Sequence, residues 1–162
     1  MRRKDRALTA EETAAVLEKG VFGVLSTAGS DGLPYGIPVS YVYQEGRVYF
    51  HCALEGRKAK NMAARPQVSF CVVGFVQAVH DGGFGTYYES AVLEGLAEQV
   101  QDVQERILIL HSLADKYLPA YKEHAPAYIS KLLRLTSIYR IIPQTVSGKA
   151  RRPKAQSADA AK

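Results

Sequence analysis

The sequence lacks any apolar run near the ~18 residues that a transmembrane helix needs, so we expect no membrane-spanning segment. Its basic N-terminus leads into acidic residues instead of an apolar segment, which argues against a secretory signal. Cysteine is scarce as well, because Cys52 and Cys71 stand without CxxC or zinc-type Cys/His spacing. These absences predict a cytoplasmic protein with two free thiols and no metal site.

Motifs for hydrolysis and for common nucleotide sites are also missing. The sequence has no GxSxG, no HExxH and no paired-carboxylate motif, and it lacks the glycines of a Walker loop or a dinucleotide fingerprint. The residues therefore give no sign of a nucleophile or an acid–base pair.

Positive charge is concentrated at the two ends of the chain. The net charge of +5 combines +3 in residues 1–6 and +4 in residues 149–162, which leaves −2 for the body. A nucleic-acid-binding face needs cations spread over a folded surface. We therefore expect no nucleic-acid partner, and we interpret residues 149–162 as a basic, disordered tail.

The body of the chain, residues 1–148, has the patterning of one mainly β domain with peripheral helices. Alternating apolar residues predict six strands, at 21–28, 35–43, 47–51, 67–79, 86–100 and 135–142. Capping patterns and apolar spacing predict helices at 10–19, about 57–64, 103–117 and 126–133. Short connections favour an antiparallel sheet, and six strands of this length favour a barrel. Gly95, inside a strand, indicates a bulge or a close backbone approach.

The stretch FHCALEGRKAKNMAARP, residues 50–66, carries the clearest chemical signal. Arg57 and Lys58 follow Gly56 at the start of a predicted helix, where free N–H groups carry partial positive charge. Two cations added to such a site suit a phosphate. The alternative is a solvated basic turn, since Lys60 and Arg65 lie nearby.

His51 ends the strand just before this helix. A lone histidine is more often structural than reactive, but a strand end close to an anion site is where the reactive part of a ligand could lie. The other histidines, His80, His111 and His124, lack such neighbours, and we assign them no role.

Three segments in order, PYGIPVSYVY, RVYFHCALEGRKAKNMAARPQVSF and YYESAVLEGLAEQV, resemble the pyridoxamine 5′-phosphate oxidase-like family of FMN-binding split β-barrels. The N-terminal MRRKDR and the histidine before ALEG are similar to its nitroimidazole-resistance reductase branch. The resemblance implies a six-stranded split barrel and a homodimer that binds FMN between its subunits. The residues it implies for cofactor binding are Pro38, Val39 and Ser40 beside the flavin ring, Phe50 and His51 at the strand end, Arg57 and Lys58 on the phosphate, and Ser90 near the phosphate or ribityl chain. It also implies His51 as the catalytic residue.

The sequence departs from true pyridoxamine phosphate oxidases at its C-terminal segment. That segment, YRIIPQTVSGKARR, lacks their tryptophan and arginine–histidine pattern, and the whole chain contains no tryptophan. The resemblance therefore implies an FMN-dependent oxidoreductase that passes electrons from reduced nicotinamide to a small acceptor, with a nitroaromatic as one candidate. Two alternatives stay open: a deazaflavin- or haem-binding relative on the same barrel, and a non-catalytic flavin-binding or flavin-sensing protein.

Overall fold

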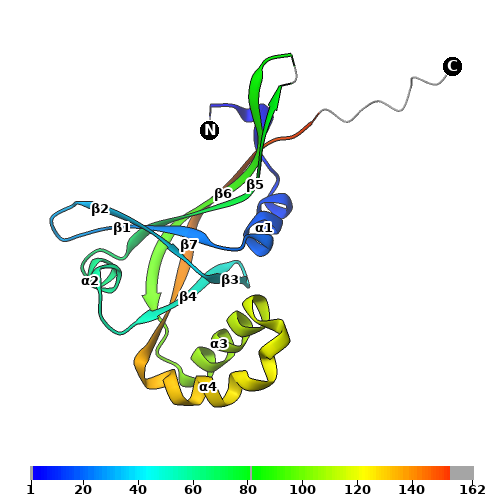
Figure 1. The fold of residues 1–162 in the computed structure, drawn as a ribbon. Helices are drawn as coiled ribbons and strands as arrows, with labels where there is room; N and C mark the ends of the chain where they lie inside the picture. Colours follow the sequence, from blue (N-terminus) through cyan, green and yellow to red (C-terminus); the bar gives the residue numbers. More distant parts are fainter. Residues whose placement is uncertain (1, 81, 154–162) are drawn as a thin grey trace.

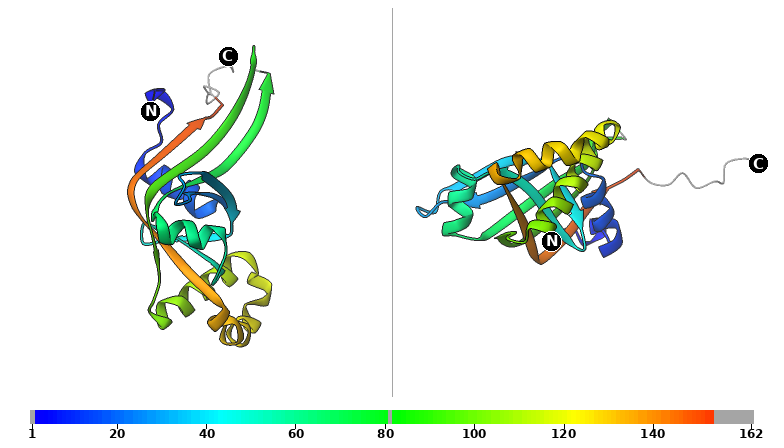
Figure 2. Two further views of the ribbon diagram at one scale, coloured as in Figure 1. Left: turned by 90° about the vertical axis from the view of Figure 1, so that its left-hand side faces the viewer. Right: turned by 90° about the horizontal axis from the view of Figure 1, so that it is seen from below.

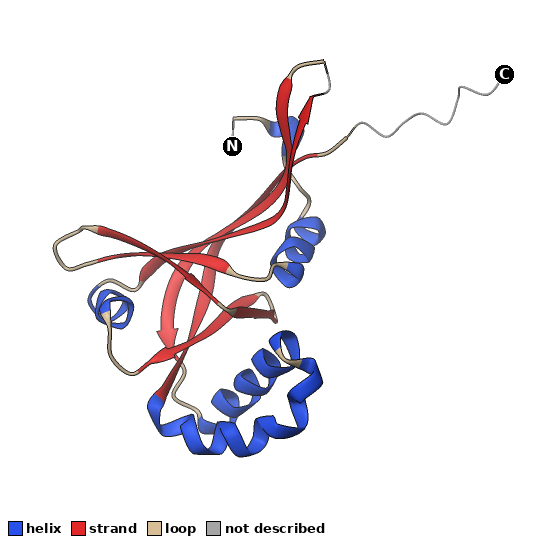
Figure 3. Cartoon of the chain, in the orientation of Figure 1, coloured by secondary structure: helices blue, strands red, loops and turns tan. Residues whose placement is uncertain are grey.

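A computed structural model describes residues 2–80 and 82–153 of the chain. Its core is one antiparallel sheet of seven strands, which curves into a split barrel with helices at its periphery (Figures 1 and 3). The strands are β1 Gly23–Ala28, β2 Pro34–Val39, β3 Tyr41–Gln44, β4 Arg47–Ala53, β5 Gln67–His80, β6 Phe84–Gln99 and β7 Thr136–Arg151. Their order in the sheet is β2-β1-β5-β6-β7-β4-β3. The predicted fold class is confirmed, with seven strands in place of six and a sheet that does not close.

The extra strand arises because the segment predicted as one strand, 35–43, changes partner at Ser40. Before Ser40, β2 pairs with β1, with Pro38 opposite Val24. After it, β3 pairs with β4, with Tyr41 opposite Phe50. One extended segment therefore supplies both edges of the open sheet, which local alternation of apolar residues could not reveal.

The predicted helices form where their capping residues indicated. The helices are α1 Ala10–Lys19, α2 Arg57–Ala64, α3 Val103–Tyr117 and α4 Ala125–Leu132, with short 3-10 turns η1 Lys4–Arg6, η2 Pro119–His124 and η3 Leu133–Leu135. Thr9 and Glu12 make both hydrogen bonds of a capping box on α1. Asp102 caps α3 by accepting a hydrogen bond of 2.7 Å from the backbone N–H of Glu105.

The hydrophobic core lies inside the curve of the sheet, with α1 packed against β5, β6 and β7. Tyr41 and Phe70 are fully buried there in an edge-to-face pair, and the Tyr41 hydroxyl donates to the carbonyl of Leu17 on α1. A second cluster, formed by Ile109 and Leu113 with residues of the sheet, fixes α3 on the side of β3 and β4. Figure 2 shows α3 and α4 together at this end of the sheet, away from the β5–β6 ribbon.

Gly95 has both features that were predicted for it. The pairing of β6 with β7 shifts register between Glu94 and Gly95, which marks a bulge. A side chain at Gly95 would place its Cβ 2.0 Å from the carbonyl oxygen of Ile142. The bulge therefore needs a residue without a Cβ.

The predicted boundary at residue 148 falls inside a strand. β7 continues to Arg151, because Lys149 pairs with Ser90 on β6 and forms a bridge with Ala7. Residues 149–151 therefore belong to the sheet, and the rest of the predicted tail from 154 lies outside the described residues. Among residues 2–80 and 82–153, none of the helices combines the length and the apolar character of a membrane span.

Candidate functional site

Helix α2 begins with an arrangement that suits an anion. Gly56 precedes the helix with φ 139°, no side chain caps its N-terminus, and no acidic residue lies in its first turn. Arg57 and Lys58 are its first two residues, and no ion pair joins either of them to an acid within the described part of the chain. Free N–H groups, a guanidinium and an ammonium therefore lie together, which fits the phosphate of a flavin nucleotide.

The barrel holds α2 in a fixed place. The buried amide of Asn61 donates a hydrogen bond of 2.9 Å to the Thr27 hydroxyl on β1, and that hydroxyl donates to the carbonyl of Tyr35 on β2. The Tyr35 ring in turn supports Arg57, whose guanidinium carbon lies 4.4 Å from the ring centroid. The cations at the helix start are thus positioned against β1 and β2.

The other predicted site residues lie on β2 and β4, near Ser40, where the chain leaves its pairing with β1 and begins to pair with β4. Pro38 and Ser40 are exposed, and Val39 is half-buried. On β4 the residues alternate, so His51 is exposed while Phe50 is fully buried and stacks on Tyr139. A flavin could therefore contact Phe50 through its backbone but not through its ring.

The surroundings of His51 favour its neutral form. Desolvation by the protein atoms around the imidazole lowers its pKa below the ordinary value of 6.5, and the nearby charge of Lys58 lowers it further. Because part of the side chain stays exposed, solvent screens these effects. His51 is therefore mostly an uncharged imidazole at pH 7.

Ser90 lies apart from this group. It is on β6, opposite Val73 of β5 and Lys149 of β7, and it does not line the cavity described next. Within one chain the structure brings Ser40 and His51 together and places Arg57 and Lys58 on the adjoining helix, but it does not add Ser90 to them.

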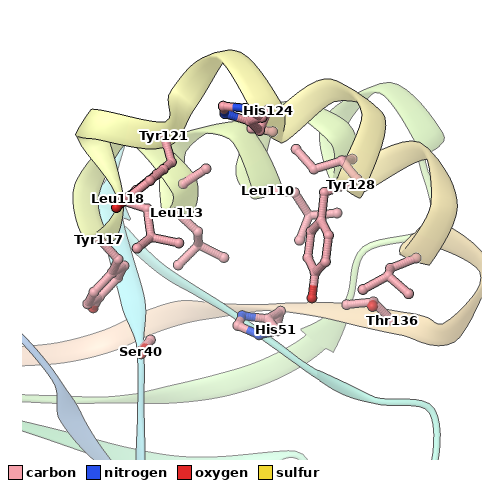
Figure 4. A pocket seen from close by; sticks show the side chains of 14 residues that line it. Ser40, His51, Leu110, Leu113, Tyr117, Leu118, Tyr121, His124, Tyr128 and Thr136 are labelled. Carbon is pink, nitrogen blue, oxygen red and sulfur yellow. The ribbon is translucent and has the colours of Figure 1, made fainter.

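A cavity of about 470 Å³ opens beside His51 and Ser40, between the sheet and the helices at its end (Figure 4). Each helix presents one face to it at the spacing i, i+3, i+4 and i+7. Its walls are Ser40, His51 and Thr136 from the strands, Leu110, Leu113, Ala114 and Tyr117 from α3, Leu118, Tyr121 and His124 from the α3–α4 connection and η2, and Ala125, Tyr128, Ile129 and Leu132 from α4. A ligand at His51 would therefore meet a mostly apolar, aromatic surface.

The sequence pattern of the family described as pyridoxamine 5′-phosphate oxidase matches residues 9–150. The chain belongs to this family. It is a flavin-binding family, so the cationic start of α2 and the strand positions beside it lie in a fold that holds flavins. No curated protein matches the sequence.

Solved structures share the fold of this chain. A candidate 5-nitroimidazole antibiotic resistance protein from Bacteroides thetaiotaomicron is 18% identical with a TM-score of 0.75, over 89% of this chain and 86% of that one. The flavocytochrome Anf3 from Azotobacter vinelandii is 22% identical with a TM-score of 0.79, over 98% and 75% of the two chains. An FAD-binding protein from Mesorhizobium loti is 27% identical with a TM-score of 0.64, over 91% and 98%.

The sequence did not predict the part of the cavity wall that the helices form. No role was assigned to His124, Tyr121 or Tyr128 from the sequence, yet all three line the cavity from η2 and α4. The regular spacing of Leu110, Ala114 and Tyr117 signalled an apolar helix face. It could not show that the face would enclose a cavity.

Proposed function

We propose that the chain is an FMN-dependent oxidoreductase that passes electrons from reduced nicotinamide to a small acceptor, with a nitroaromatic as the leading class. One observation carries the proposal: a cation-bearing, uncapped helix start follows directly on the strand that places His51 at an apolar cavity. FMN has the matching form, a phosphate at one end and an aromatic ring at the other. When bound, it would supply the redox chemistry.

Different residues of the chain would bind the phosphate, position the flavin ring and contact the acceptor. In this proposal Arg57 and Lys58 hold the phosphate, and the backbone of Pro38, Val39 and Ser40 lines the ring. His51, as the catalytic residue, faces the acceptor and offers it a hydrogen bond from a neutral imidazole. Ser90 would reach the cofactor from a second copy of the chain, because within one chain it lies away from α2.

An apolar row on the outer face of the sheet supports the further proposal of a homodimer. The strand registers place Val24, Cys71 and Val92 side by side across β1, β5 and β6, and Ser90 lies one step along the same face. Val24 and Val73 of this face are exposed in the single chain. A second copy of the chain would cover them.

The cofactor proposal is tested on the purified protein. We expect a yellow protein with a flavin absorbance spectrum, and we expect the double variant Arg57→Ala/Lys58→Ala to lose FMN on gel filtration. The matched control Lys60→Ala/Lys131→Ala removes the same charge from exposed positions and should keep FMN. A colourless wild-type protein that binds no FMN in titration would contradict the proposal.

Further titrations and assays separate the alternatives. Competition among FMN, FAD and a deazaflavin identifies the preferred flavin, which matters because the Mesorhizobium loti relative binds FAD. Oxidation of reduced nicotinamide with a panel of acceptors tests turnover. FMN binding without reduction of any acceptor would favour a non-catalytic flavin-binding protein.

A further inference from the structure

The distal parts of β5 and β6 form an arm of two strands. β7 ends at Arg151, which lies opposite Tyr88, and beyond this pair β5 and β6 continue as a ladder of two strands. We call residues 75–80 and 82–87 the arm; it projects from the sheet at the end opposite α3 and α4 (Figures 1 and 2). Since an isolated two-stranded hairpin is only marginally stable in water, such an arm gains stability when it packs against another surface.

The arm presents apolar side chains on both of its faces. The strand register places Val76 and Phe84 on one face and Phe75 and Val79 on the other. Phe84 is 98% exposed and Val76 is 61% exposed in the single chain, and Phe75 is exposed as well. None of the arm residues is a lysine, arginine, aspartate or glutamate. An exposed apolar surface without charge is typical of a site of protein–protein contact.

The cavity beside His51 has an apolar rim that is open to the outside. Leu118, Tyr121 and Tyr128 line the cavity, yet these side chains are between 57% and 66% exposed. In Figure 4, Leu118 and Tyr121 stand on one side of the cavity and Tyr128 on the other. We call these three residues the rim. They leave an apolar opening that a second molecule can cover.

The arm and the cavity lie on the same face of the sheet as the apolar row that supports the homodimer. From Val92 in that row, alternate residues of β6 lead through Ser90 to the face of the arm that carries Val76. At the other end of the sheet, Phe50 is buried in the core and the next residue, His51, is exposed, so His51 points outwards. One continuous surface therefore runs from the arm, past the row, to the cavity.

The lengths of the strands suit a two-fold symmetric dimer. At ~3.4 Å per residue, β6 covers about 27 Å from Val92 to Phe84 in the arm, and β7 covers about 36 Å from Ser147, opposite Val92, to Thr136 at the cavity. A two-fold axis that runs between the copies and across the strands reverses the direction of the partner. Because the two lengths are comparable, this symmetry brings the arm of each copy to the cavity of the other.

We propose that the arm of a second copy of the chain packs on the rim and closes the cavity beside His51. The inference rests on the homodimer of the proposed function. Phe84 of the arm covers the opening and excludes water, so each cavity is complete only in the dimer. Ser90 lies at the base of the arm, and a partner that brings Ser90 to the cofactor brings the arm to the same side.

The test uses the absence of tryptophan from the chain, because a tryptophan introduced in the arm is then the only one. We would record the fluorescence of full-length Phe84→Trp, with and without FMN, on samples whose mass is measured by light scattering. We expect the dimer to show blue-shifted emission and several-fold slower quenching by acrylamide than the monomer made by adding Val73→Asp. The control Leu108→Trp, exposed on α3 outside the cavity, should show solvent-exposed emission in both states.

A charge on the rim identifies the surface that the arm contacts. Leu118→Asp, added to Phe84→Trp, should return the emission towards that of a solvent-exposed tryptophan while the protein remains a dimer. Leu108→Asp is the matched control and should leave the emission unchanged. If Leu118→Asp does not fold, Tyr121→Asp places the same charge at another position of the rim.

The outcomes separate this inference from the proposals on which it rests. A dimer in which the tryptophan of Phe84→Trp is as exposed as that of Leu108→Trp would overturn the inference, leave the homodimer standing and leave the arm to a different partner. A buried tryptophan that does not respond to a charge on the rim would place the arm elsewhere, such as against the other arm, and would also overturn it. A monomer at high concentration would contradict both the homodimer and the inference, while FMN retention is judged on its own.

Discussion

The pKa of the His51 imidazole depends on the groups around it, so measuring this pKa tests the arrangement of the site. Two causes lower the pKa of its imidazole, first desolvation and then the charge of Lys58. Since the pKa in the folded protein lies below the ordinary 6.5, the unfolded chain takes up this proton first. His51 therefore has no effect on stability well above pH 6.5 and lowers stability as the pH falls below that value.

Replacing Lys58 should move this pKa in a known direction. We expect Lys58→Met to raise the pKa of His51 towards 6.5, because it removes a nearby positive charge while the desolvation remains. NMR titration of the imidazole C–H signals measures the change, with His51→Gln assigning the signal. Lys60→Met, a change on the same helix, is the control and should leave the pKa unchanged. An unchanged pKa in Lys58→Met would show that Lys58 does not act on His51.

At the level of residues, the sequence was informative where chemistry is local. Arg57 and Lys58 follow Gly56, and all three lie at a helix start whose donors are free, as their spacing predicted. The role of Phe50 shows the limit, because alternation along β4 buries its side chain in the core. His124 could not be found from the sequence, since only the folded chain brings it and His51 to the wall of one cavity.

At the level of elements, the Gly95 bulge joins the two longest strands of the sheet. We expect Gly95→Ala to destabilise the protein by more than about 2 kcal/mol, because its Cβ would press on the backbone of Ile142, which cannot move like a flexible side chain. Chemical denaturation measures the loss.

Gly36→Ala is the matched control for this change. Gly36 lies on β2, where an added Cβ would meet the Val24 side chain at 3.6 Å, an ordinary contact. It should change the free energy of unfolding far less than Gly95→Ala. Similar losses for the two variants would mean that the close approach at Gly95 does not determine stability.

The helices were more predictable than the strands, for a physical reason. Capping by Thr9 and Asp102 involves residues three positions apart, so the signal is contained in a short stretch of sequence. The partners of the 34–44 segment lie in different hairpins, and the extension of β7 to Arg151 depends on β6. Such pairings join residues that are far apart in the sequence, so a short stretch of sequence carries little signal for them.

For the whole molecule, the apolar row across β1, β5 and β6 predicts self-association. We expect light scattering after gel filtration to give about twice the chain mass of 17.8 kDa. Val73→Asp places a charge on this face and should shift the protein towards the monomer. Leu108→Asp, at an exposed position of α3, is the control and should not. A wild-type monomer at high concentration would contradict the dimer and the proposed role of Ser90.

The change of partner at Ser40 also bears on how the chain folds. The hairpins β1–β2, β3–β4 and β5–β6 each join neighbouring segments and can form early. The pairing of β4 with β7 joins two strands that lie far apart in the sequence, since β4 ends at Ala53 and β7 begins at Thr136. Forming it requires the closure of a long loop, which has a high entropic cost, so we expect it to form later. The cavity wall combines strand residues such as Ser40 with the distant helices. We therefore expect the surface that would receive a ligand to be among the last parts of the protein to assemble.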